Sequence, residues 1–553
     1  MNIKGIMVIS LGTESRVSLS KVTRLGFVSL SLSFFSVQVL DNESVLVLGV
    51  PLGFFVGVDC GSQGTKTVVV DCENGKIVGS DYVNYGLIEG LPFGHREQNP
   101  STWVDAMLET IHSAIGEAKI DPKKVEGIGV SGQQHGFVPL DSAGRVIRFA
   151  KLWNDTSTID ECRWLIERLG GVREVVKLTG NSILPGFTAG KILWLKRHEP
   201  NNFVRLSKVL LPHDYLNFWL TGRVTMEPGD ASGTGLMDVR TRCWRREVVD
   251  AIDPDLIWKL PDIQSSGEPS GSLREEAAEK LGLNEGVLVS AGGGDNMMSA
   301  IGTGNTRPRI VTVSLGTSGT VYAYSEKPVV DPSGEAHAFC DSTGAWLPLA
   351  CTMNVTVATE AVRGLLGYGY EELEKAVEAT PVGSNGVIFL PYLTGERTPN
   401  IPDGKGVLYG LTPENFRAGN IARAAMEGAT MGLNFGFNRL KEMGIEPNEV
   451  RLTGGGSRNK AWRRICADVF GVEVVCLEVD EGAAYGAALQ ALWTKERDLS
   501  ENAKISEITD RFVHLDESTR VKPNQRNTKT YRNLQRLQDK LSIDLRGAFS
   551  LVA

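Results

Sequence analysis

One aspartate, Asp295, and three glycine-rich turns are the residues of this chain whose types and spacing could perform chemistry. The turns lie at 59–66, 314–320 and 454–459, and Asp295 directly follows three consecutive glycines. Glycine lets the backbone approach a ligand closely, and a turn that exposes its N–H groups can bind phosphate. Phosphate-binding turns together with a carboxylate predict the transfer of a phosphoryl group from ATP to a small acceptor.

The turns at 59–66 and 314–320 each lie between two β-branched strands, so each predicts a hairpin with a glycine-rich tip. Two such hairpins that face each other would hold the phosphates of ATP between them. One glycine turn alone is more typical of an ordinary β-hairpin, but two matched turns that begin two matched halves favour an ATP site. We expect the ATP-binding residues of these turns to be Gly61, Gly64, Thr65, Lys66, Gly316 and Thr317.

Two carboxylates have predicted roles in such a reaction. Asp59 ends the first strand, where a carboxylate could hold Mg²⁺ at the phosphates, directly or through water. Asp295 could act as a general base, because a hydroxyl is a poor nucleophile until another group accepts its proton. A carboxylate at the start of a helix is as typical of a simple helix cap, so residue type alone leaves both roles open for Asp295.

The elements that position these residues alternate between strands and helices, in an order that occurs twice. This order predicts an α/β fold of two ribonuclease-H-like domains with a cleft for ATP and the acceptor between them. In the first half we expect strands at 56–59, 66–71, 76–84 and 128–132 and a helix at 100–119. In the second half we expect strands at 310–313, 320–325, 345–349, 451–453 and 472–477 and helices at 355–366, 421–441, 461–470 and 482–494.

The same pattern divides the chain into four parts. Residues 1–54 are rich in serine and aliphatic side chains. They are predicted to be a disordered extension, with a mistranslated extension as the alternative and a targeting segment less favoured. Residues 55–300 form the first domain and residues 301–517 the second. Residues 518–553 are basic and polar, which is typical of a tail whose helix is solvated.

Composition narrows the class of partner. The 553 residues carry a formal net charge of −8, which argues against nucleic acid as a ligand and favours a small molecule. No stretch reaches the roughly 20 apolar residues that span a bilayer, so we expect no membrane partner. The eight cysteines include no Cys-x-x-Cys pair, which is typical of a protein in a reducing compartment, and we expect a cytoplasmic location.

Several longer segments resemble the FGGY family of carbohydrate kinases, which belongs to the actin and hexokinase superfamily. The similarity extends over about 56–493 and includes the segments 186–195 (GFTAGKILWL) and 406–411 (GVLYGL), with the helix that follows. The resemblance implies that 55–300 is the sugar-binding FGGY domain and that 301–517 is the nucleotide-binding one. It also implies ATP and Mg²⁺ as cofactors, and a homodimer is a further expectation.

The resemblance also implies roles for individual residues. The segment 132–136 (GQQHG) is similar to the sugar-binding loop of family members that phosphorylate D-xylulose, and 152–155 (LWND) is similar to their next substrate segment. Gln134 stands where many relatives have methionine, so ribulose, glycerol and a gluconate-type acid remain alternative acceptors. An actin-like or chaperone ATPase shares the nucleotide cleft but leaves both segments unexplained. The implied sugar contacts are Gln134, His135, Trp153, Asn154 and Asp295, with Asp295 as the base. The resemblance also implies that Gly454, Gly455 and Asn459 border the adenine and ribose.

Overall fold

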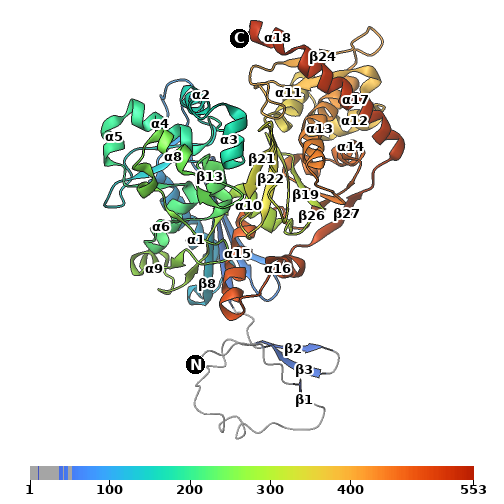
Figure 1. Cartoon of the computed structure of the whole chain (residues 1–553). Helices are drawn as coiled ribbons and strands as arrows, with labels where there is room; N and C mark the ends of the chain where they lie inside the picture. Colours follow the sequence, from blue (N-terminus) through green and yellow to red (C-terminus); the bar gives the residue numbers. More distant parts are fainter. Residues whose placement is uncertain (1–9, 12–35, 41–42, 48–52, 553) are drawn as a thin grey trace, which may run out of the picture.

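The computed structural model describes residues 10–11, 36–40, 43–47 and 53–552, and from Phe54 onward they form two α/β domains (Figure 1). The first domain contains a sheet in the order β16-β17-β8-β4-β5-β6, with β18 paired to β8. β4 and β5 form the hairpin predicted for the first glycine turn, and β4 lies parallel to β8. The strands are β4 (Phe54–Cys60), β5 (Gly64–Asp71), β6 (Ile77–Asn84), β8 (Val125–Gly132), β16 (Gly271–Ser272), β17 (Leu288–Val289) and β18 (Gly293–Gly294).

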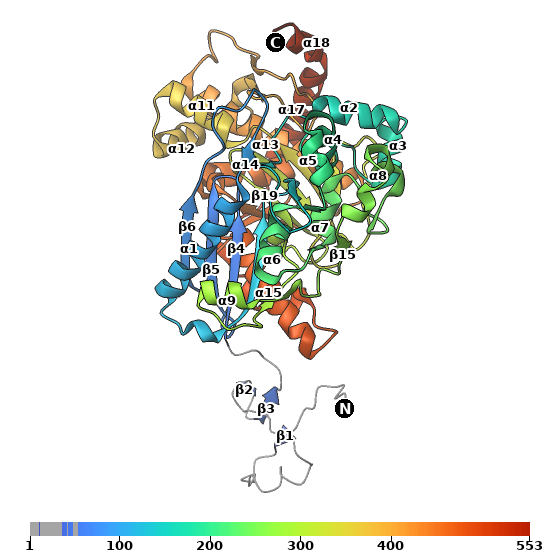
Figure 2. The same ribbon diagram turned by 90° about the vertical axis from the view of Figure 1, so that its left-hand side faces the viewer.

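Helices cover both faces of this sheet, whose strands β4, β5 and β6 lie side by side in Figure 2. Successive side chains of a strand point to opposite faces, so β4 contributes to two hydrophobic clusters. Val56 and Val58 share one cluster with Trp103 of α1 (Pro100–Ala118). Phe55 belongs to the other cluster, which is formed with α15 (Ala483–Leu499). The first sheet is therefore buried on both sides.

α15 comes from the far end of the chain, yet it packs on β4 and β8 of the first domain. Two glycines allow this close approach. A Cβ atom at Gly57 or Gly129 would overlap the backbone carbonyls of Ala484 and Ala487. Small residues on both partners thus let the helix lie directly on the sheet, as the predicted alanine-rich helix at 482–494 suggested.

The second domain repeats this plan with a sheet in the order β21-β22-β20-β19-β25-β26-β27. β19 and β20 form the hairpin predicted for the second glycine turn, and β19 lies parallel to β25. The strands are β19 (Ile310–Ser314), β20 (Gly319–Ala323), β21 (His337–Cys340), β22 (Trp346–Thr352), β25 (Glu449–Thr453), β26 (Glu473–Leu477) and β27 (Leu515–Val521). The helices are α11 (Thr356–Leu366), α12 (Tyr370–Ala379), α13 (Ala418–Glu442), α14 (Lys460–Phe470), α16 (Ile505–Phe512), α17 (Gln525–Asp544) and α18 (Arg546–Phe549).

The C-terminal residues differ from the solvated tail expected for 518–553. The expected start of that tail lies inside β27, which pairs with β26 at the edge of the second sheet. In α17, Tyr531 is buried, and its hydroxyl donates to Glu427 Oε1 at 2.7 Å. The basic residues of this helix occupy its outer side, and its inner side packs on α13 and α14. Because basic residues are so numerous in this segment, the sequence did not reveal the apolar and hydrogen-bonding side chains of the inner side.

A mainly helical insertion lies between β8 and β16 and carries a hydrophobic cluster of its own. Its helices are α2 (Ile159–Arg168), α3 (Val172–Thr179), α4 (Thr188–His198), α5 (Pro200–Arg205), α6 (Pro212–Thr221), α7 (Pro228–Ala231) and α8 (Arg246–Ile252). Its short strands are β9 (Val138–Leu140), β10 (Ala150–Lys151), β11 (Lys208–Leu210), β12 (Thr225–Met226), β13 (Met237–Asp238), β14 (Cys243–Trp244) and β15 (Asp262–Ile263). Beyond the insertion, α9 (Glu275–Leu281) and α10 (Asp295–Gly302) lead into the second domain. Two further strand pairs lie outside the main sheets. β7 (Glu97–Gln98) pairs with β10, and β23 (Ile388–Pro391) pairs with β24 (Gly406–Tyr409).

The expected disordered extension, 1–54, lies mostly outside the described residues. Of its described residues, β1 (Ser10–Leu11), β2 (Ser36–Leu40) and β3 (Glu43–Val47) pair as an antiparallel sheet in the order β1-β3-β2. Within the part of the chain that the structure describes, no helix is both long and apolar enough to cross a bilayer.

Candidate active site

A cavity of about 260 Å³ lies between the two domains, with Asp295 in its wall. The first domain contributes the loop after β8 and the start of α10, and the second contributes residues of β20, β21 and β22. Such a cavity, with a few polar groups among aromatic side chains, is typical of a small-molecule site. The lining residues include Gln134, His135, Trp153, Asp295, Asn296, Tyr322, His337, Phe339, Cys351 and Arg397.

Asp295 is the first residue of α10, and Gly294 takes the N-cap position, with no side-chain cap bond. The carboxylate accepts hydrogen bonds from the backbone N–H of Asn296 at 2.8 Å and from Asn296 Nδ2 at 3.0 Å. Burial, followed by the charge of Asp59, raises the pKa of Asp295 to about 7. A carboxylate with its pKa near neutrality in a cavity wall has the properties of a general base, whereas a simple helix cap needs no such pKa.

His135 has a backbone φ of 64°, which is unusual for a residue with a side chain. Its carbonyl accepts hydrogen bonds from Lys191 Nζ at 2.6 Å and from Thr188 Oγ1 at 3.1 Å, and Lys191 is fully buried. The ring packs against Phe187 and Phe339, and its buried Nδ1 has no hydrogen-bond partner among the described residues. Burial lowers the pKa of His135 well below 6.5, so the ring is neutral.

Gln134 precedes this histidine and reaches the start of α10. Its Oε1 accepts a hydrogen bond from Asn296 Nδ2 at 2.8 Å, and its Nε2 donates to Met297 Sδ at 3.2 Å. Asn296 Nδ2 thereby links Gln134 to Asp295. Gln134, which stands where many relatives have methionine, thus contacts Met297 directly.

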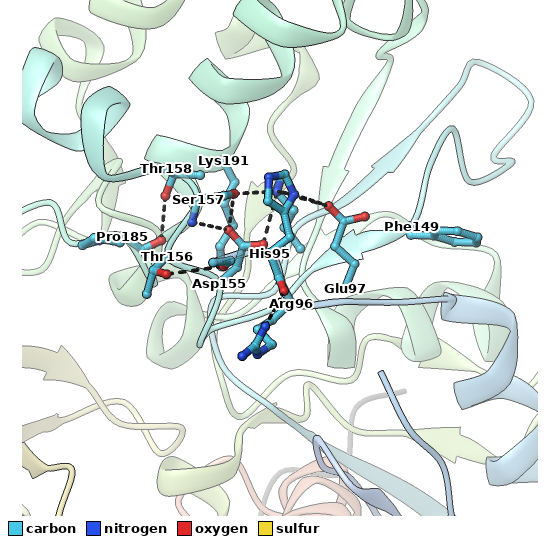
Figure 3. Close-up of polar contacts among 12 residues, drawn as sticks. His95, Arg96, Glu97, Phe149, Asp155, Thr156, Ser157, Thr158, Pro185 and Lys191 are labelled. Atoms are coloured by element: carbon cyan, nitrogen blue, oxygen red, sulfur yellow. Dashed lines mark hydrogen bonds and ion pairs between the residues drawn. The ribbon is translucent and has the colours of Figure 1, made fainter. Parts of the chain in front are cut away.

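The loop that carries Trp153 is held by a cluster of buried charges (Figure 3). His95, Glu97 and Asp155 have the side chains of a metal site, and their ligand atoms lie close together. The ammonium group of Lys151 occupies this place instead, at 3.1 Å from Glu97 Oε1 and 3.2 Å from Asp155 Oδ2. A buried lysine with two carboxylate partners has a structural role and does not need a metal ion. Here it fixes both ends of the loop that presents Trp153 to the cavity.

Trp153 is oriented further by the first glycine turn, since its Nε1 donates to Ser62 Oγ at 2.8 Å. Asn154, predicted to contact the sugar, is not among the residues that line the cavity. Its buried Oδ1 has no hydrogen-bond partner among the described residues. The loop therefore brings Trp153 to the site and leaves Asn154 beside it.

The first and second glycine turns face each other across a second cavity of about 570 Å³, lined by Asp59, Gly61, Gly64 and Thr317 among others. Asp59 Oδ1 accepts a hydrogen bond from Ser131 Oγ at 2.7 Å, and burial raises the pKa of Asp59. This cavity adjoins the one that contains Asp295, because Trp153 and Ser318 line both. The two turns thus meet as predicted from their matched positions.

Two residues predicted to bind phosphate point elsewhere. Thr65 is fully buried, and its hydroxyl is bonded to that of Tyr85 at 3.0 Å. This position follows from the alternation of β5, which turns every second side chain into the core. Lys66 is half-exposed, and its Nζ forms an ion pair with Glu481 Oε1 at 2.6 Å.

A third cavity, of about 550 Å³, lies along the 454–459 turn between α11, α12 and α14. Gly455 and Asn459 line it with Thr356, Tyr370 and Met426, and a Cβ at Gly455 would meet nothing within 4 Å. Gly454 adopts a φ of 81° and lies against Leu315, so it connects this turn to the second hairpin. A pocket of apolar side chains beside an open glycine backbone fits the flat base of a nucleotide.

Sequence reasoning did not single out several second-domain residues in the sugar-side cavity, among them Tyr322, His337 and Arg397. Tyr322 and His337 lie within strands, where an inward-facing side chain is normally part of the core. Arg397 lies in a glycine- and proline-containing loop, 395–399 (GERTP), whose unusual composition was the one available signal.

Comparison with known proteins agrees with this arrangement. The model of the FGGY family of carbohydrate kinases, N-terminal domain, matches residues 54–302, and the C-terminal domain model matches 311–494. A xylulose kinase of Haemophilus influenzae is 42% identical over 485 residues, which cover 87% of this chain and 97% of that protein. A xylulose kinase of Bacillus subtilis is 34% identical over 497 residues, covering 87% and 95%.

Among solved structures, a ligand-bound xylulose kinase from Lactobacillus acidophilus superimposes with a TM-score of 0.84 and 26% identity. The match covers 90% of this chain and the whole of that one. Both family domain models thus match in order, on a fold shared with a solved xylulose kinase. This chain belongs to the FGGY family of carbohydrate kinases.

Proposed function

We propose that this protein transfers the γ-phosphoryl group of ATP to the 5-hydroxyl of D-xylulose, yielding D-xylulose 5-phosphate. The observation that carries the proposal is the position of Asp295, in the wall of the sugar-side cavity and within electrostatic reach of Asp59 in the glycine-turn cavity. A base is needed at the point where acceptor and phosphate meet. The xylulose kinases named above, at up to 42% identity, support D-xylulose as the acceptor.

Asp295 would accept the proton of the attacking hydroxyl. Its pKa of about 7 lets the carboxylate ionise at neutral pH and still bind a proton readily as the hydroxyl oxygen gains bonding to phosphorus. Asn296 donates two hydrogen bonds to one carboxylate oxygen, which keeps the group in a single orientation. The second oxygen would receive the proton.

The neutral ring of His135 and the side chains of Gln134 and Trp153 would bind the other oxygen atoms of the sugar. Since the His135 ring carries no charge, it can donate from one nitrogen and accept at the other. Lys191 and Thr188 hold the carbonyl of His135, so the ring is in place before the sugar binds. Preorganised contacts of this kind place the reacting hydroxyl close to the phosphate.

The glycine turns fit the phosphates of ATP. Gly61, Gly64 and Gly316 keep the backbone free of side chains at the tips of the two hairpins. Lys66, which is ion-paired with Glu481 in this structure, would turn to the phosphates as a positive charge. The Asp59 carboxylate offers the hard oxygen ligand that Mg²⁺ prefers. The metal would supply neutralisation of the phosphate charge, and the adenine would bind along Gly454, Gly455 and Asn459.

The experiment that tests the proposal measures ADP release from Mg–ATP by the purified protein, with no sugar and then with each of several acceptors. We expect strong stimulation by D-xylulose and weak stimulation by D-ribulose, glycerol and gluconate. Stimulation by one of the latter would keep the mechanism and change the acceptor, with Gln134 as the first residue to replace. A rate of ADP release that no acceptor stimulates would favour an actin-like ATPase and contradict the proposal.

The homodimer and the cytoplasmic location expected from the sequence stay predictions. Size-exclusion chromatography with light scattering would measure the mass in solution against the 60.0 kDa of one chain.

A further inference from the structure

Arg397 enters the sugar-side cavity from the second domain, opposite the loop that carries His135. It lies a few residues after β23 and lines the cavity together with His135 and Asp295. Its guanidinium faces the first domain: a Cβ added at Gly186 would stand 3.9 Å from Arg397 Nη2. The first domain alone therefore does not complete the sugar cavity.

Half of this side chain is buried, yet its charge has no carboxylate partner. Among the residues that the structure describes, no Asp or Glu lies within 4.0 Å of the guanidinium.

 A guanidinium has five N–H donors, and removing it from water without an acceptor is costly. A half-buried guanidinium that lines a cavity and has no carboxylate partner indicates that a ligand supplies acceptors.

The loop that carries Arg397 is fixed in place by the residue before it. Glu396 is buried, and its carboxylate accepts hydrogen bonds from the backbone N–H of Met353 at 2.6 Å, from Asn354 Nδ2 at 3.2 Å and from the N–H of Arg397 at 2.8 Å. Asn354 also donates to the carbonyl of Gly395 at 2.6 Å. These bonds attach the loop to the end of β22, whose Cys351 lines the same cavity. The backbone position of Arg397 is therefore set by the fold.

Two imidazoles that line the sugar-side cavity with Arg397, those of His135 and His337, are neutral. Burial, with the charge of Arg397 as a further cause, lowers the pKa of His337 to about 3 and that of His135 well below its usual value. These two imidazoles thus carry no positive charge that would repel the guanidinium. They also carry no negative charge that would satisfy it.

We infer that Arg397 is a substrate-binding residue, contributed by the second domain, which donates hydrogen bonds to oxygen atoms of the bound sugar. The inference rests on the proposed function, since it names a further contact of the same site. A sugar presents hydroxyl and carbonyl oxygens in every direction and so offers the acceptors that the cavity wall lacks. The guanidinium lies on the side of Gly186 and His135, whereas the glycine turns that face the phosphates line the neighbouring cavity.

The test compares Arg397→Met and Arg397→Lys with a matched control, Arg464→Met. Arg464 lies on the surface of the same domain in an exposed ion pair with Glu378. Binding of D-xylulose without nucleotide is measured by calorimetry, and KM and kcat are measured with saturating ATP. We expect Arg397→Met to bind D-xylulose about 10- to 100-fold more weakly, as for the loss of hydrogen bonds from a charged donor, and Arg397→Lys to recover part of that loss.

Binding of ADP, measured on the same samples, shows whether each variant is folded. Unchanged sugar affinity in a folded Arg397→Met protein would overturn the inference. Unchanged sugar affinity with a slower kcat would likewise overturn it and assign the guanidinium to the transferred phosphoryl group. If the unaltered protein binds no D-xylulose, the proposed function itself has failed, which is a different result from the failure of Arg397 alone.

Discussion

Replacing Asp295 by asparagine should abolish most activity and yet stabilise the protein at alkaline pH. Asparagine has the same shape, and its carbonyl oxygen can still accept the two hydrogen bonds that Asn296 donates to Asp295. It cannot accept a proton from the sugar. A general base contributes about 10²- to 10⁴-fold to the rate, so we expect a loss of that size in kcat.

The stability change follows from the pKa of Asp295, which burial raises from 3.8 to about 7. A raised pKa means that the folded protein binds the proton more tightly than the unfolded chain, so ionisation destabilises the fold as the pH rises. At pH 5 the cost is about 1.6 kcal/mol, and above pH 7 it reaches about 4 kcal/mol, at 1.36 kcal/mol per pH unit. Asp295→Asn removes this cost.

The assay is thermal unfolding of both proteins at pH 5 and pH 8, in the presence of a chelator so that no metal ion contributes. With an unfolding entropy of about 2.1 cal/mol/K per residue, the 553 residues convert 4 kcal/mol into about 3.5 °C. We therefore expect the Tm advantage of Asp295→Asn to grow from about 1.4 °C at pH 5 to about 3.5 °C at pH 8. A Tm advantage of Asp295→Asn that is smaller at pH 8 than at pH 5 would refute this reasoning. An unchanged kcat in Asp295→Asn would refute it as well.

Three further predictions concern the same site. The kcat/KM for the sugar should fall about tenfold per pH unit below about pH 7, because Asp295 must be ionised to act as a base; a flat profile between pH 5 and 7 would contradict this. Lys191→Met should weaken sugar binding about tenfold in calorimetry, because the carbonyl of His135 loses its charged donor, and leave ADP binding within about twofold. Lys66→Met should raise the KM for ATP about tenfold. It should change the free energy of unfolding by less than about 1 kcal/mol, because the ion pair of Lys66 with Glu481 is partly exposed. A large loss of stability would show a structural role instead.

Much of the fold could be predicted because its signals are local. β-branched runs on either side of glycine turns indicated the hairpins β4–β5 and β19–β20, and the helical spacing of apolar residues indicated α1 and α13. Asp295 was recognisable from the three glycines before it. Each of these signals lies within a few residues of the feature that it predicts.

The features that were missed depend on contacts between distant segments. Arg397 meets the loop of His135 only after the two domains have come together, and nothing in its neighbours specifies that meeting. Thr65 was expected to bind phosphate because of its place in the turn, but the pairing of β5 turns it toward Tyr85. The polar composition of α17 concealed Tyr531, whose partners Arg423 and Glu427 lie about one hundred residues away in α13.

The position of α15 on the first sheet bears on how the protein is made. The strands β4 and β8 leave the ribosome early, but the helix that covers one of their faces ends only at Leu499. Roughly 200 residues separate the end of the first family domain at 302 from that point, which at a synthesis rate of about 5 to 20 residues per second is a delay of about 10 to 40 s. During this interval Phe55 and its neighbours lack their cover. We therefore expect the nascent chain to need chaperones and a fragment ending near residue 302 to aggregate when expressed alone.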